Sequence, residues 1–152
     1  MYKKVTMLFK LVLKLTLFLV ILSYGALVIY ASLPLEALPT QELVTKDDLF
    51  IKVSDHDIRY RQYLTEEDHS PNLILIHGFG NNLHSWRSIT PLLSENYNIF
   101  ALDLLGFGLS AKPTDYDYSN ANQAETIGKF ADALNLDSFI VGGHSLGGAI
   151  GL

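Results

Sequence analysis

The chain has 152 residues, of which 49% are hydrophobic and 18% are charged, a composition typical of a folded or membrane-embedded protein. The charges are unevenly distributed. Lys3, Lys4, Lys10 and Lys14 lie in the first fourteen residues, whereas all sixteen carboxylates follow residue 35 and outnumber the seven Lys and Arg there. This acidic body excludes nucleic acid as a partner, because phosphate binding needs clustered basic side chains. The absence of cysteine excludes disulfides and thiolate metal sites.

A long uncharged segment near the N-terminus predicts one membrane-spanning helix. The nineteen residues 15–33 carry no charge, and as a helix they would span about 28 Å, close to the hydrocarbon thickness of a bilayer. Lysines before the segment and carboxylates after it favour a cytoplasmic N-terminus and an extracytoplasmic body. We therefore expect a basic start and single-pass anchor over residues 1–33. A tether follows over residues 34–48, where Pro34 and Pro39 end the helix.

Two alternatives for this segment stay open. A cleaved signal peptide would share the basic start, but its apolar core is usually about 7–15 residues long and ends at a small-x-small site. The nearest such site is Ser23-Tyr24-Gly25, which lies inside the apolar run. The other alternative is a helix buried in a soluble protein.

Residues 49–152 contain five predicted strands. Residues 49–53 and 58–64 flank the turn-forming residues 54–57 and predict an antiparallel hairpin. Three short continuous apolar runs follow, of the kind found in parallel strands that are buried on both faces. These runs are residues 73–76, 99–102 and 139–141.

Helices are expected between these runs, over residues 85–95 and residues 120–135, the second of which has apolar side chains at helical spacing. An alternation of strands and helices predicts a doubly wound α/β sheet. Right-handed crossovers would bring the carboxyl ends of the parallel strands to one edge, where such folds place their sites.

The last apolar run leads into Gly143-His144-Ser145-Leu146-Gly147. A serine in this setting is typical of a nucleophile elbow, a tight strand-to-helix turn that exposes the serine hydroxyl. The turn tolerates almost no side chain two residues to either side, which explains the glycines. The motif therefore predicts Ser145 as a catalytic nucleophile.

Three further motifs precede the elbow in a fixed order. They are Leu75-Ile76-His77-Gly78-Phe79-Gly80, then Trp86 with its following helix, and then Asp103-Leu104-Leu105-Gly106-Phe107-Gly108-Leu109-Ser110. The ordered set resembles the α/β-hydrolase superfamily, in the branch with a serine nucleophile. The resemblance implies an oxyanion hole formed by the backbone N–H groups of Phe79 and Leu146. We expect no cofactor and no metal ion.

Several residues invite other interpretations. The resemblance makes His77 and His144 packing or hydrogen-bonding residues, and Asp103 a loop-shaping residue, although Asp103 as a catalytic acid is an alternative. The segment from Gly106 to Ala111 fits the pattern G-x-G-x-x-A. In dinucleotide-binding proteins this pattern opens a helix whose N-terminus holds the pyrophosphate, and Pro113 argues against a helix here.

The resemblance implies a membrane-anchored hydrolase of small-molecule acyl substrates, either esters or lipid-like compounds. A carbon–carbon bond hydrolase or perhydrolase of the same fold is an alternative. The family's sheet has further strands beyond the five predicted here, and its triad acid and histidine follow the nucleophile in the chain. We therefore expect a catalytically incomplete N-terminal fragment with the acid and histidine beyond residue 152, or else a non-catalytic membrane-tethered fragment.

Overall fold

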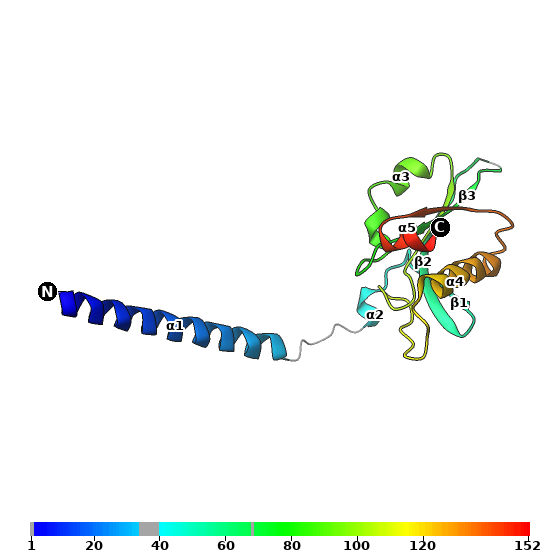
Figure 1. Cartoon of the computed structure of the whole chain (residues 1–152). Helices are drawn as coiled ribbons and strands as arrows, with labels where there is room; N and C mark the ends of the chain where they lie inside the picture. The colour runs from blue at the N-terminus through cyan, green and yellow to red at the C-terminus, as the bar shows by residue number, and fades with distance from the viewer. Residues whose placement is uncertain (1, 34–39, 68) are drawn as a thin grey trace. The chain divides into compact units, whose positions relative to one another are not determined.

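The computed structural model describes residues 2–33, 40–67 and 69–152, and the chain divides into two compact units, Met1–Leu38 and Pro39–Leu152 (Figure 1). The first unit contains the helix α1 (Tyr2–Ser32). Its segment Phe9–Ser32 contains an 18-residue stretch with a mean hydropathy of 2.3 that is not buried, so the segment is long and apolar enough to cross a membrane or to serve as a signal sequence. Residues 34–39 of the expected tether lie outside the described residues.

The second unit is built on one mixed sheet with the strand order β1-β2-β4-β3-β5. The strands β1 and β2 are antiparallel, β2 is antiparallel to β4, and β3 is parallel to both β4 and β5. Their bounds are β1 (Leu49–Val53), β2 (His56–Tyr63), β3 (Asn72–Ile76), β4 (Asn98–Leu102) and β5 (Ile140–Gly143). The expected hairpin and the three parallel strands are confirmed, but β5 is not buried on both faces: it lies at the edge of the described sheet, and Ile140 is 48% exposed.

The hairpin turn is shorter than the sequence predicted. Val53 pairs with His56, so the loop consists of Ser54 and Asp55 alone, and β2 begins two residues earlier than expected. Ser54 has a φ of 53°, a left-handed backbone angle of the kind that tight hairpin turns require.

The helix predicted over residues 85–95 is wrong as a single element. The structure has a short 3₁₀ helix, η1 (Leu83–Trp86), and a one-turn helix, α3 (Thr90–Leu93). Pro91 lies in the first turn of α3, where its missing N–H costs nothing, whereas in a continuous helix over residues 85–95 the same position would lose a backbone hydrogen bond.

The other helix is confirmed. Helix α4 (Asn120–Ala133) begins at the cap residue Ser119, whose side chain accepts a hydrogen bond from the Asn122 N–H. No helix begins directly after Gly106-x-Gly108; the next helix in the described chain is α4. Two short helices complete the unit, α2 (Thr40–Leu43) and α5 (Leu146–Ile150).

Side chains alternate along β3 between two hydrophobic clusters. Ile74 and Ile76 pack in the cluster that contains Phe130 of α4, whereas Leu73 and Leu75 pack with Leu83 of η1. Successive strand residues point to opposite faces, so an apolar run without alternation marks a strand that is covered on both sides. The helices α4 and α5 therefore cover one face, and η1 and α3 cover the other (Figure 1).

Phe130→Ala should lower the free energy of unfolding by about 3–5 kcal/mol, because Phe130 is fully buried and packs edge-to-face on Tyr60 with the ring centroids 5.4 Å apart. Urea unfolding followed by the fluorescence of Trp86 measures this loss. Lys129→Ala, at the exposed neighbouring position, should change the value by less than about 0.5 kcal/mol. Equal unfolding midpoints for the two variants would contradict this account of the core.

Candidate active site

The backbone reverses sharply at Ser145, between the end of β5 and the start of α5. Ser145 has φ 53° and ψ −114°, an unusual conformation for a residue with a side chain, and it is exposed. The turn is held by two backbone hydrogen bonds. The His144 N–H donates to Ile76 O at 3.2 Å, and the Gly147 N–H donates to His144 O at 2.9 Å.

Two glycines make this turn possible. A Cβ at Gly147 would overlap the carbonyl of Ile76, and a Cβ at Gly143 would overlap the backbone of Gly147. On the facing loop, a Cβ at Gly78 would lie 3.3 Å from the Cβ of Ser145. The loop that follows β3 therefore lies directly against the serine, where a hydrogen-bond donor for a bound carbonyl oxygen would be needed.

A cavity of about 450 Å³ opens beside this turn and has both Phe79 and Leu146 in its wall. Ser145 itself does not line the cavity, whereas the next residue, Leu146, does. Phe79 is 81% exposed and packs edge-to-face on Phe107. The remaining wall residues are Gly106, Phe107, Lys112, Tyr118, Asn120 and Gln123.

His77 is fully buried and both of its ring nitrogens are bonded to backbone. The Nε2 atom accepts a hydrogen bond from the Leu104 N–H at 3.1 Å, so Nδ1 carries the proton and donates to Gly78 O at 2.7 Å. Burial lowers the pKa of His77 and favours this neutral form. The interpretation of His77 as a hydrogen-bonding residue is confirmed.

Asp103 is fully buried at the end of β4 and organises the adjoining loops. Its Oδ1 accepts from the Leu83 N–H at 2.7 Å, and its Oδ2 accepts from the Leu109 N–H at 2.8 Å and from Arg59 at 3.2 Å. A Cβ at Gly108 would overlap this carboxylate. Asp103 therefore shapes the adjoining loops, and among the described residues its carboxylate accepts no hydrogen bond from a histidine, as a triad acid would.

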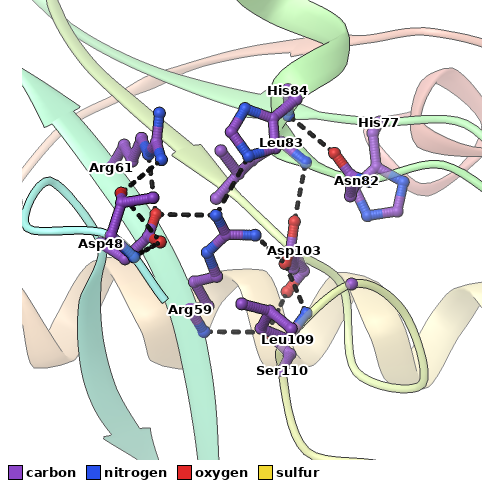
Figure 2. A network of polar contacts seen from close by, with 12 residues as sticks. Asp48, Arg59, Arg61, His77, Asn82, Leu83, His84, Asp103, Leu109 and Ser110 are labelled. Atoms are coloured by element: carbon purple, nitrogen blue, oxygen red, sulfur yellow. Dashed lines mark hydrogen bonds and ion pairs between the residues drawn. The ribbon is translucent and has the colours of Figure 1, made fainter. Parts of the chain in front are cut away.

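The sequence did not predict the ion-pair network that surrounds Asp103 (Figure 2). Arg59 lies between Asp103 and Asp48, and donates to Asp48 Oδ1 at 2.8 Å; Arg61 donates to the same oxygen at 2.7 Å. Arg59 also donates to His84 Nε2 at 3.2 Å. The one signal in the sequence was the pair of arginines at alternate positions of a predicted strand, which places them on one face.

The charges in this network set the protonation of its members. Burial acts to raise the pKa of Asp48, but hydrogen bonds from Arg61, the Thr45 N–H and Arg59 outweigh it and hold that pKa well below its usual range. Burial, together with the positive charges of Arg61 and Arg59, lowers the pKa of His84. At neutral pH the network thus contains an ionised carboxylate and a neutral imidazole.

Comparison with protein families gives one match that covers more than half of the chain. The family model described as alpha/beta hydrolase fold matches residues 71–152. This segment contains β3, β4, α4, the turn at Ser145 and α5.

Similar proteins include hydrolases of several kinds. The chain is 40% identical over 84 residues to a 2-hydroxy-6-oxo-6-(2'-aminophenyl)hexa-2,4-dienoic acid hydrolase of Metapseudomonas resinovorans, which covers 53% of this chain and 29% of that protein. It is 38% identical over 99 residues to the probable lysophospholipase BODYGUARD 4 of Arabidopsis thaliana, which covers 63% of this chain and 24% of that protein. The chain thus spans less than a third of the length of these curated relatives.

A solved structure is similar over a longer part of the chain. The crystal structure of a membrane phospholipase A, described as a bacterial virulence factor, matches with a TM-score of 0.64 and 30% identity. The match covers 93% of this chain and 45% of that protein.

Asp48→Asn should lower the free energy of unfolding by about 3 kcal/mol at pH 7, because it leaves two arginines without their shared carboxylate. The folded pKa of Asp48 lies below its unfolded value of about 3.9, so its contribution is complete above about pH 5 and is lost as the pH falls through the folded pKa. The acid limb of the stability profile should therefore become shallower in the variant.

Urea unfolding between pH 2 and pH 7 measures both effects. Glu125→Gln is the matched control, because it removes a carboxylate from the exposed pair with Lys129 and should cost less than about 1 kcal/mol. If the free energy of unfolding of Asp48→Asn falls with decreasing pH as steeply as that of the native chain, this description of the network is incorrect.

Proposed function

Because the chain belongs to the α/β-hydrolase family, we propose that it is the nucleophile-bearing part of a membrane-anchored serine hydrolase that acts on ester or lipid-like acyl substrates. The observation that carries the proposal is the backbone conformation of Ser145, with φ 53° and ψ −114°, on an exposed turn that lies against Gly78. Strained backbone of this kind is concentrated at functional sites, where the surrounding structure holds it in place.

In the proposed reaction, Ser145 Oγ attacks the acyl carbonyl, and the backbone N–H groups of Phe79 and Leu146 bind the developing oxyanion. His77 is not assigned as the base because both of its ring nitrogens are bonded to backbone, and Asp103 is not assigned as the acid because its carboxylate binds Arg59 and two loop N–H groups and no histidine. We place the histidine base and its carboxylate partner in the part of the longer relatives that this chain does not match. A serine at this position argues against the branches of the family that use an aspartate nucleophile.

The kind of substrate is supported by the apolar cavity and by two similar proteins. Phe79, Phe107, Tyr118 and Leu146 give the cavity beside Ser145 a predominantly apolar wall. A probable lysophospholipase and a membrane phospholipase A are among the similar proteins. A carbon–carbon bond hydrolase is the second candidate, favoured by the 40% identity to the dienoic acid hydrolase.

The membrane anchor is part of the same proposal, with residues 1–33 as the basic start and anchor. The tether expected over residues 34–48 is shorter than predicted, because Thr40 to Asp48 belong to the second unit, where Asp48 is buried against Arg59. The apolar segment Phe9–Ser32 supports the anchor. The match to a membrane phospholipase A also supports it. This match covers 93% of the chain and therefore extends beyond the unit Pro39–Leu152 into the segment that contains the apolar helix. The lysines before the segment favour a cytoplasmic N-terminus and an extracytoplasmic hydrolase part.

In membranes that contain the natural protein, a fluorophosphonate probe should label Ser145, because an activated serine attacks phosphorus as it attacks an acyl carbon. Ser145→Ala should abolish the labelling, whereas Ser85→Ala should retain it, because Ser85 lies in η1 and donates to Asn82 O. Mass spectrometry of the labelled peptide identifies the site. Labelling that persists in Ser145→Ala, or that is absent from the natural protein, would refute the assignment of the nucleophile.

The anchor is tested by fractionation. The protein should remain with the membranes after washing at pH 11, and its intact mass should include residues 1–33, because a spanning helix is held by its apolar surface and not by charge. A mature protein in the soluble fraction that begins near residue 26 or 32 would instead support a cleaved signal peptide.

A further inference from the structure

The cavity beside Ser145 combines an apolar wall with one cation. Among the residues that line it, in the described part of the chain, Lys112 is the one with a charged side chain. No carboxylate belongs to the wall, although carboxylates outnumber lysines and arginines in this body. The charge balance inside the cavity is therefore opposite to that of the surface around it.

The ammonium group of Lys112 is held in one place by the backbone. It donates to Gly108 O at 2.8 Å and to Ser110 O at 3.1 Å. An ammonium group has three N–H donors, so one is left for a ligand. Because the two carbonyls carry only partial charges, the full positive charge of Lys112 is not neutralised by them.

None of the ion pairs among the described residues includes Lys112, and two carboxylates of the adjoining segments are bonded to other groups. Asp103 is paired with Arg59 and with backbone N–H groups below the loop. Asp117 accepts hydrogen bonds from the N–H and the hydroxyl of Ser119. An anion from outside the chain is therefore the group best suited to pair with Lys112.

The rest of the wall is suited to the apolar part of the same ligand. The hydroxyl of Tyr118 donates to Pro113 O at 2.7 Å, so the ring packs on Gly106 while its polar end is already bonded. The rings of Phe79 and Phe107, which also line the cavity, pack edge-to-face on each other. A volume of about 450 Å³ lies in the range of pockets for one small ligand, which favours one acyl chain over two.

We propose that this cavity binds a single-chain acyl lipid with a phosphate group, with its ester next to Phe79 and Leu146 and its phosphate on Lys112. The inference rests on the proposed function, because it names the substrate class for that site. A lysophospholipid satisfies the description, whereas a neutral ester makes no use of the charge of Lys112, which is exposed at the mouth of the cavity.

The test is direct binding, which does not require turnover. The full chain in phosphatidylcholine nanodiscs is titrated calorimetrically with hexyl phosphate, hexanol, hexanoate and inorganic phosphate. Hexyl phosphate should bind about tenfold more tightly than hexanol, equivalent to about 1.4 kcal/mol. Its affinity should fall as salt is raised, while that of hexanol should not.

Variants locate the charge. Lys112→Met should lower the affinity for hexyl phosphate about tenfold and leave hexanol unchanged, and Lys112→Arg should retain most of the affinity. Lys129→Met is the matched control, because Lys129 is an exposed lysine of α4 that pairs with Glu125. If Lys112→Met fails to fold, the salt dependence of the native chain and the Lys112→Arg variant still test the proposal.

Four results would overturn the proposal. They are equal binding of hexanol and hexyl phosphate, equal losses in the Lys112→Met and Lys129→Met variants, tighter binding of hexanoate, and equal binding of inorganic phosphate. The third would indicate a carboxylate ligand, and the fourth a site for free phosphate. Binding of hexyl phosphate by a chain whose Ser145 is not labelled would refute the serine hydrolase and leave this site standing.

Discussion

The buried carboxylate of Asp103 is the constraint on which the arrangement around the candidate site depends. A buried charge is tolerated only when it is paired and hydrogen-bonded, and Asp103 obtains its partners from three separate segments. These are Arg59 on β2, the Leu83 N–H after β3, and the Leu109 N–H after β4. The loops that follow β3 and β4 therefore have one low-energy arrangement, because any other would leave a charge buried without its partners.

The candidate nucleophile Ser145 is attached to the same framework through the last residue of β3. Ile76 O accepts the His144 N–H, and its position leaves no room for a side chain at Gly147. The residues that follow Ile76 form the loop against Ser145. The turn at Ser145 and the loop that faces it are thus both held by the end of β3. Their relative position is therefore set by the backbone of the sheet and not by flexible side chains.

What the sequence could predict was local. The continuous apolar runs identified β3 and β4 because a strand covered on both faces has no polar alternation, and the glycines around Ser145 identified a turn that excludes side chains. The network of Asp48 and Arg59 could not be predicted in this way, since its partners are far apart in sequence and meet only when the sheet has formed. The division of the helix predicted over residues 85–95 did have a local signal, Pro91, but the spacing of the apolar residues alone did not take it into account.

The elbow and the cavity wall are specified by different physical means, which bears on how one fold serves several hydrolases. The elbow depends on backbone shape, where glycines prevent overlaps and leave little freedom of substitution. The wall depends on side chains such as Phe107, Lys112 and Tyr118, which belong to the segment between β4 and α4. Because Asp103 fixes the start of that segment through backbone N–H groups, side chains further along it can change without disturbing the elbow. Reaction type and choice of ligand are therefore separable in this chain, and similarity in the elbow alone does not define the substrate.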